Sequence, residues 1–106
     1  MMLIVTTDTI TNQTIIEVKG LVRGSSVRSK HIGKDIGASF KSIVGGELNG
    51  YNEMLAEARQ IAIGRMVEDA TKQGANAIVG VRLMSSAVMQ GAAEMVAYGT
   101  GVVIKE

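Results

Sequence analysis

The chain has 106 residues, a formal net charge of +1 and no cysteine. We expect a single domain over residues 1–106, with no basic field for nucleic acid and no polybasic anchor for a membrane surface. The lack of cysteine excludes disulfides, thiolate metal sites and a cysteine nucleophile.

The first ten residues carry no basic stretch ahead of an apolar run, so we expect no signal peptide. No segment approaches the roughly 20 consecutive apolar residues that a membrane span requires. The sequence therefore predicts a cytoplasmic protein. Its first elements are a β-strand over residues 3–9 and a turn over residues 11–13.

Residues 14–27 alternate between apolar and polar side chains. This alternation places Ile16, Val18 and Val22 on one face, with Glu17 and Lys19 on the other, and indicates a strand with one solvated side. Gly20 and Gly24 interrupt the pattern, which indicates a bend or a bulge.

The period changes to that of a helix after this strand. Residues 34–46 predict a short helix that ends at two glycines, and residues from about 47 to 73 predict a long helix. Gly74 is the expected C-cap, because glycine adopts the left-handed conformation that ends many helices.

Residues 77–88 and 94–104 predict two further strands, with residues 89–93 as the hairpin connection. Strands that flank two helices, with the last two strands in a hairpin, are typical of the α+β class. The sequence therefore predicts a two-layer sandwich of an antiparallel sheet with one short and one long helix.

The apolar residues of the long helix form two neighbouring stripes that cover more than half of its circumference. A helix that packs on one sheet needs a stripe only about 100° wide. The short helix could cover the extra face, but a second copy of the chain is the interpretation that we favour. One stripe contains Tyr51, Met54, Ala58, Ile61 and Arg65, and the other contains Leu48, Leu55, Ala62, Ile63, Met66 and Ala70.

Arg59 falls inside the second stripe on the helical wheel. An unpaired buried charge costs several kcal/mol, so Arg59 either extends its charged end to water or pairs with a carboxylate. We expect it to be a structural ion-pair residue of the assembly, with Glu47, Asp35 and Glu94 as candidate partners.

A set of short motifs occurs in a characteristic order and spacing. They are DIGAS at 35–39, GGE at 45–47, Tyr51, AR at 58–59, RM at 65–66, GANAIVGVR at 74–82 and AYGT at 97–100. Together they resemble the YbjQ-like family of small prokaryotic proteins of unknown function, over roughly Val18 to Ile104. The resemblance implies a dodecin-like fold and a ring-shaped homopentamer.

The same family has carried a heavy-metal-binding label, and the residues of this chain argue against it. Zinc, copper and nickel sites need several cysteine or histidine ligands, whereas the chain has only His31. A ring could gather one His31 from each subunit, although a lone loop histidine is usually solvated. Met54 and Met66 lie at core-facing helical positions and are interpreted as core residues. We expect no metal site and no cofactor.

Two groups of polar residues are candidates for binding. Arg28 and Lys30 lie in a basic segment rich in glycine and serine, just before the short helix, where backbone N–H groups can hold an anion. Glu47, Tyr51 and Arg65 share one side of the long helix and could form a polar pocket. A solvated loop explains the first group equally simply, and a hydrogen-bond network at a subunit interface explains the second.

The sequence contains no arguable nucleophile, base and orienting group in one set. This favours a non-enzymatic homo-oligomer, a pentamer by the resemblance, that acts as a binding or scaffold protein with ligand sites between its subunits. The alternative is a small enzyme, or an anion- or metal-binding protein, built on the side of the long helix that carries Glu47, Tyr51 and Arg65. In either case, the expected partner is the chain itself.

Overall fold

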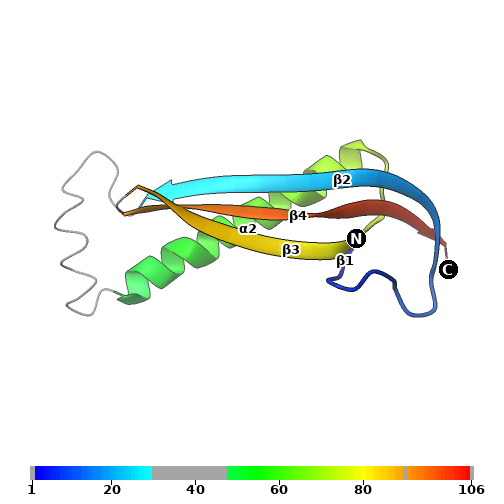
Figure 1. The fold of residues 1–106 in the computed structure, drawn as a ribbon, viewed down its shortest axis with the longest axis horizontal. Helices are drawn as coiled ribbons and strands as arrows, with labels where there is room; N and C mark the ends of the chain where they lie inside the picture. The colour runs from blue at the N-terminus through cyan, green and yellow to red at the C-terminus, as the bar shows by residue number, and fades with distance from the viewer. Residues whose placement is uncertain (1, 30–47, 90, 106) are drawn as a thin grey trace.

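The structure is a computed structural model that describes residues 2–29, 48–89 and 91–105. In this part of the chain a long helix lies against one face of a four-stranded sheet (Figure 1). The elements in chain order are β1 (Leu3–Ile4), β2 (Thr14–Ser29), α2 (Leu48–Lys72), β3 (Ala77–Met89) and β4 (Ala92–Lys105). The short helix expected over residues 34–46 lies outside the described residues.

The sheet has the strand order β1-β3-β4-β2 and is mixed rather than antiparallel throughout. The β3–β4 hairpin and the β2–β4 pair are antiparallel, as expected, but β1 pairs with the start of β3 in parallel. The prediction of an antiparallel sheet was therefore wrong at one edge. Because β1 is only two residues long, it carries little pattern, and the sequence could not reveal whether it runs parallel or antiparallel to β3.

The strand expected over residues 3–9 ends at Ile4. Beyond it the chain still follows β3 through scattered main-chain hydrogen bonds, such as that from the amide of Val81 to the carbonyl of Val5 at 3.0 Å. Gly80 has a φ of +62°, and the β3–β4 register shifts between Val79 and Arg82. This local irregularity in β3 accompanies the end of the regular ladder with β1.

The long helix ends as the sequence predicts. Gly74 has a φ of +86°, and its amide donates to the carbonyl of Thr71 at 3.0 Å. The amide of Ala75 donates to the carbonyl of Ala70 at 3.0 Å, which completes a Schellman motif. Asn76 then fixes the return of the chain: its side chain accepts from the amide of Ile104 at 2.7 Å and donates to the carbonyl of the same residue at 3.1 Å.

The two glycines of β2 have different roles. Gly20 has a φ of +118° beside a register shift, so it forms the expected bulge. The single apolar face expected for Ile16, Val18 and Val22 was wrong, because the extra residue at this shift reverses the alternation: Val22 is buried, whereas Ile16 and Val18 are exposed. Gly24 lies in regular register opposite Ala97, and a bulge there was the wrong expectation. A Cβ at Gly24 would collide with the main chain of α2 at Ala62 and Met66, so this glycine lets the helix approach the strand closely.

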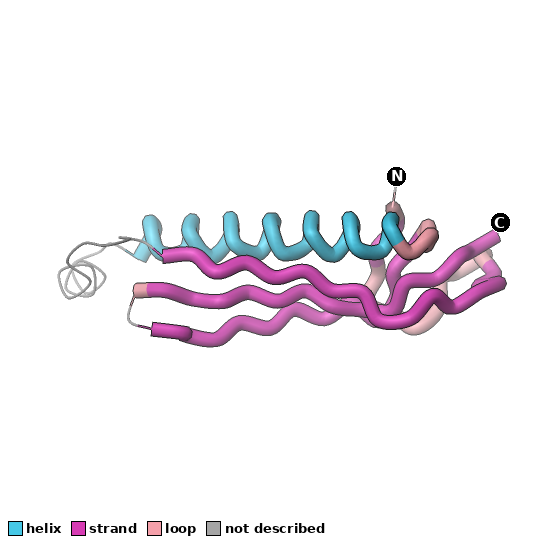
Figure 2. The backbone as a smooth tube through the Cα atoms, turned by 90° about the horizontal axis from the view of Figure 1, so that it is seen from above, coloured by secondary structure: helices cyan, strands magenta, loops and turns pink. Residues whose placement is uncertain are grey.

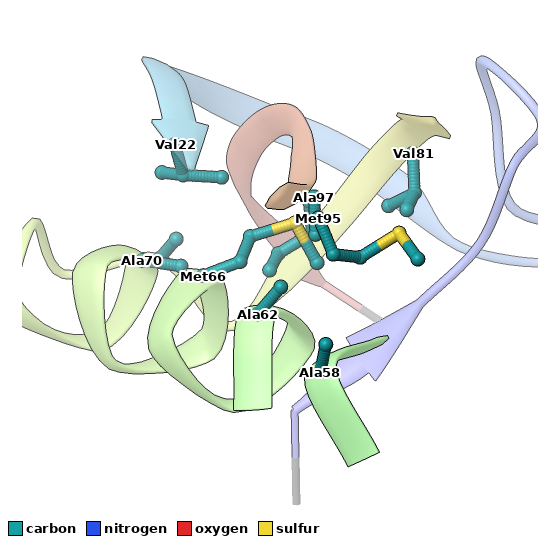
Figure 3. Packing of buried hydrophobic residues seen from close by; sticks show 10 residues of the cluster. Val22, Ala58, Ala62, Met66, Ala70, Val81, Met95 and Ala97 are labelled. Carbon is teal, nitrogen blue, oxygen red and sulfur yellow. The ribbon is translucent and has the colours of Figure 1, made fainter. Parts of the chain in front are cut away.

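The core between the helix and the sheet consists largely of small side chains. Ala58, Ala62 and Ala70 of the helix are completely buried, and Val22 and Met66 fill the space beside them (Figure 3). Small residues on both layers bring the backbones together, but each buries little apolar area. This core is therefore tight and modest in its contribution to stability.

A second, smaller cluster lies on the sheet face away from the helix. Val5 and Ile10 of the N-terminal segment pack there against Val79 and Val102, whereas Met2 packs against the helix-side cluster. Met2 and Val5 face opposite sides because the segment first follows the edge of β3, and Ile10 then lies on the face away from the helix. Figure 2 shows the helix above the sheet and part of the connecting segment below it.

The buried line of the helix runs through Ala58, Ala62, Met66 and Ala70, which follow one another at intervals of four residues. A line of this spacing is inclined to the helix axis by about 26°, and α2 crosses the strands obliquely (Figure 1). One wheel therefore cannot describe all of this 25-residue helix. Arg59, which the wheel placed among buried residues, is exposed in the single chain.

The molecule is a rod with extents of 52 × 23 × 19 Å and a radius of gyration of 17.0 Å. A compact domain of this length has a radius of gyration of about 13 Å. In the described ranges, no helix is both long and apolar enough to span a membrane.

Candidate functional site

The most organised polar contacts of the described residues lie where α2 meets the outer edge of β2. The guanidinium of Arg65 donates to the carbonyl of Ser25 at 2.7 Å, and the amide of Arg23 donates to the carboxylate of Asp69 at 3.0 Å. The side-chain amide of Gln73 donates to the carbonyl of Leu21 at 3.3 Å. We call Arg65, Asp69 and Gln73 the polar ladder.

The polar ladder follows directly from helix and strand geometry. Its members are spaced by four residues, so they lie on one side of the helix. Alternate residues of an edge strand turn their main-chain groups away from the sheet, and residues 21, 23 and 25 do so in β2. The three helix side chains therefore occupy main-chain groups that would otherwise be open to another strand.

Asp69 is the described carboxylate with a clearly perturbed pKa. The main-chain hydrogen bond from Arg23 lowers its pKa below the usual value of 3.8, and the hydrogen bond from the side chain of Gln73, 3.2 Å long, lowers it further. Both donors favour the charged form. The ladder is therefore a structural clamp whose central group is ionised at neutral pH.

Arg28, one of the two candidate anion-binding residues, forms an ion pair and hydrogen bond with Glu57 of the helix. Glu57 therefore offsets the positive charge of the guanidinium and occupies one of its donor groups, which weakens the case for an anion site at Arg28. Lys30, the other candidate, lies outside the described residues, as do His31 and Asp35.

The polar pocket expected from Glu47, Tyr51 and Arg65 stays a prediction. Glu47 lies outside the described residues, and Tyr51 belongs to α2 without a described side chain. Arg65 is exposed and engaged with Ser25. Its placement beside β2 comes from the close approach of the helix at Gly24.

The face of the sheet away from the helix, which we call the open face, carries the side chains of residues 21, 23, 25 and 27 of β2. Arg23 and Arg82 lie on either side of Tyr98 in the cross-strand register. The guanidinium of Arg82 is already engaged, since it donates to the carbonyl of Thr6 at 3.0 Å and to that of Val81 at 2.9 Å. Arg82 therefore helps to hold the N-terminal segment against the sheet.

No group of three or more histidine, cysteine, aspartate or glutamate side chains is placed to hold a metal ion within residues 2–29, 48–89 and 91–105. The expected absence of a metal site stays a prediction, because His31 lies outside these ranges. Glu94, a candidate partner of Arg59, is partly buried in β4, and the ion pair expected for Arg59 also stays a prediction.

Asp69 and Gln73 were not among the residues predicted from the sequence. Their spacing from Arg65, by four and eight residues, was a visible signal for a polar stripe beside the apolar one. Its use could not be inferred, because pairing of such a stripe with an edge strand depends on the position of the helix across the sheet.

Comparison with known proteins identifies relatives along almost the entire chain. The family model YbjQ_1, described as "Putative heavy-metal-binding", matches residues 2–105. A UPF0145 protein of Clostridioides difficile is 69% identical over 105 residues, which are 99% of this chain and 94% of the relative. A UPF0145 protein of Methanosarcina acetivorans is 57% identical over 103 residues, which are 97% of each chain.

A crystal structure of a protein of unknown function from Pediococcus pentosaceus, assigned to the DUF74 family, is similar in fold. It aligns with a TM-score of 0.62 and 20% sequence identity, covering 98% of each chain. At this identity the likeness concerns the fold alone. On the strength of the family match and the close relatives, the chain belongs to the YbjQ-like, or UPF0145, family of uncharacterised proteins.

Proposed function

We propose that the protein is a non-enzymatic homo-oligomer, a dodecin-like ring of five chains, that acts as a binding or scaffold protein with ligand sites between its subunits. The observation that carries this proposal is that small apolar side chains are common in the core while large ones are exposed. Five of the ten buried residues of the helix–sheet core are alanine, whereas several larger apolar side chains lie at the surface, and Val18 and Leu21 are each 65% exposed. The number five follows the family resemblance.

A ring with an odd number of chains needs a head-to-tail contact, in which one surface of a chain meets a different surface of the next. Two such surfaces are available. One is the open face of the sheet, with Leu21 and Val27 exposed, and the other is the flank of α2, where Met54, Leu55 and Ile61 are only partly buried. Within such an assembly, Arg59 would form the expected ion pair with a carboxylate.

Light scattering behind a sizing column tests the ring directly. Five chains of 11.2 kDa give 56 kDa, and a single species near the monomer mass at micromolar concentration would exclude self-assembly. Leu21→Lys adds a charge at a position that is already exposed in the single chain, so a smaller species from this variant would locate the contact on the open face. Thr11→Lys, in the exposed turn, is the matched control.

The alternative function is a small enzyme, or an anion- or metal-binding protein, that uses Glu47, Tyr51 and Arg65. The existing bond between Arg65 and Ser25 favours a structural role for this arginine. A thermal-shift series with metal ions, nucleotides, flavins and inorganic anions separates the two functions, since any ligand of the folded state raises the melting temperature. A shift that Arg65→Gln abolishes would support the alternative.

A further inference from the structure

The two edges of the sheet differ in how well they are protected from pairing with another strand. The outer edge of β2 is interrupted by two register shifts, carries the Glu17–Lys19 ion pair at 2.9 Å and is occupied by the polar ladder. These are devices by which proteins prevent an edge strand from pairing with another chain. These features close the edge of β2 to a neighbouring strand as far as Ser25.

The edge of β3 is closed only over its first half. The N-terminal segment follows it as far as Val81, and among the described residues no strand lies beside it beyond Arg82. Residues 83–89, Leu-Met-Ser-Ser-Ala-Val-Met, contain no charge and no proline, and every one of them is exposed. Met84 and Met89 are 58% and 57% exposed. We call residues 83–89 the bare edge.

The bare edge is symmetrical in side-chain size about its centre. Ser86 is flanked by the small residues Ser85 and Ala87, and these are flanked by larger apolar residues on both sides. If two such strands run antiparallel with Ser86 opposite Ser86, Ser85 lies opposite Ala87 and Met84 opposite Val88. Small side chains then meet at the centre and large ones meet at both ends, which is the self-complementarity that a two-fold contact requires.

We propose that the bare edge of β3 pairs with the bare edge of a second copy of this chain, antiparallel and centred on Ser86. The lack of charge means that two identical strands meet without repulsion. The register of β3 with β4 is continuous from Arg82 to Ala87, and the bulge that follows lies between Ala87 and Met89, so the three central residues present a regular edge. The pair would join two sheets into one that runs through both molecules.

This contact is distinct from the proposed ring, because a two-fold contact cannot close a ring of five. A seven-residue strand is roughly 24 Å long and a sheet about 10 Å thick, so the footprint is far below the roughly 800 Å² per partner of a stable interface. One such pair alone is transient. Five of them between two rings would act together, because each contact after the first is intramolecular.

Disulfide trapping tests the contact without depending on the ring. The chain has no cysteine, so Ser86→Cys introduces the single thiol. Facing residues of an antiparallel pair have Cα atoms about 4.5–5.5 Å apart, which a disulfide can bridge. We expect mild oxidation to convert most of Ser86→Cys into a covalent dimer and to leave the control Ser25→Cys, an exposed serine on β2, largely monomeric on a non-reducing gel.

The register has its own test. Ser85→Cys should cross-link poorly alone, because the two thiols lie on a diagonal about 7–8 Å apart, but efficiently when mixed with Ala87→Cys. Equal cross-linking of Ser86→Cys and Ser25→Cys, or none at Ser86→Cys in a sample whose circular dichroism matches the parent, would overturn the proposal. Efficient cross-linking of Ser85→Cys alone would also overturn it, because the register would then be wrong.

The mass of the assembly distinguishes failure of this contact from failure of the ring. Both contacts together give ten chains, 112 kDa from 11.2 kDa each, and Ala87→Lys should halve that mass because it places a charge in the strand pair. A mass of five chains without cross-linking would support the ring and contradict the strand pair. Efficient cross-linking of Ser86→Cys with no species larger than two chains would support the strand pair and contradict the ring.

Discussion

Gly24 of β2 lies directly against the main chain of Ala62 of α2. A Cβ at Gly24 would fall far inside van der Waals distance of the carbonyl oxygen of Ala62 and the amide nitrogen of Met66. The atoms that it would meet belong to the backbone, which cannot rotate aside as a side chain can. This one contact sets the distance between the helix and the sheet along the middle of the rod.

Gly24→Ala should therefore push the helix away from β2. Overpacking of this kind costs about 1–3 kcal/mol, and loss of the contacts of the polar ladder would add to it. The measurement is denaturant unfolding at fixed protein concentration. Gly64→Ala is the matched control, because its Cβ meets nothing within 4 Å on an exposed part of the same helix, and it should stabilise the protein by about 0.5–1 kcal/mol. Equal effects of the two substitutions would contradict the close contact.

The polar ladder predicts acid sensitivity through Asp69. A carboxyl group with a lowered folded-state pKa contributes stability above its unfolded pKa, and this contribution is lost as the pH falls through the folded value. We expect the stability of the parent to decline below about pH 3.8, the usual value that Asp69 would have when unfolded. Asp69→Asn should be less stable than the parent at pH 7 and should lose less stability on acidification. Melting temperatures measured between pH 2.5 and 7 would check this, with Glu68→Gln as the exposed neighbouring control.

Arg59 provides a test of the assembly. In an assembled interface, leaving its carboxylate partner buried without a counter-ion would cost about 3–5 kcal/mol, whereas an exposed ion pair contributes only about 0–1 kcal/mol. Arg59→Met keeps most of the side-chain volume, so we expect a clear fall in melting temperature or a shift to smaller species in light scattering. Gln60→Met places the same side chain at the adjacent exposed position. A variant at Arg59 that assembles and melts like the parent would show that this arginine stays in water.

The metal prediction can be separated from the family description. Calorimetric titration with zinc, nickel and copper should show no submicromolar site, because the chain offers no cysteine and one histidine. If a heat of metal binding is measured, His31→Ala tests whether His31 is a ligand. Submicromolar binding that this substitution removes would contradict the prediction and support a site assembled from several copies of the chain.

Local signals in the sequence were sufficient for the longest elements. The long helix and its end at Gly74 follow from helical periodicity and the special conformation of glycine, and the β3–β4 hairpin follows from two apolar runs around a glycine-containing connection. Each of these depends on residues that are neighbours in the chain.

The features that escaped prediction depend on how the elements cross. The parallel pairing of Leu3 and Ile4 with β3, the exposure of Arg59 and the use of Asp69 and Gln73 all require the position of one element on another. Arg59 is exposed in the single chain because the helix lies obliquely on the sheet, so the side of the helix that faces the sheet changes along its length. The polar pocket of Glu47, Tyr51 and Arg65 rests on the same helical projection and stays a prediction.

The polar ladder also bears on how far a sheet of this protein can grow. A chain with two open strand edges can add copies without limit and form a cross-β fibril. A chain with one open edge stops after a single addition, because the composite sheet then ends at a closed β2 strand on both sides. Arg65, Asp69 and Gln73 would in this way prevent further strands from adding to the sheet. The protein could therefore carry an uncharged, exposed strand without aggregating.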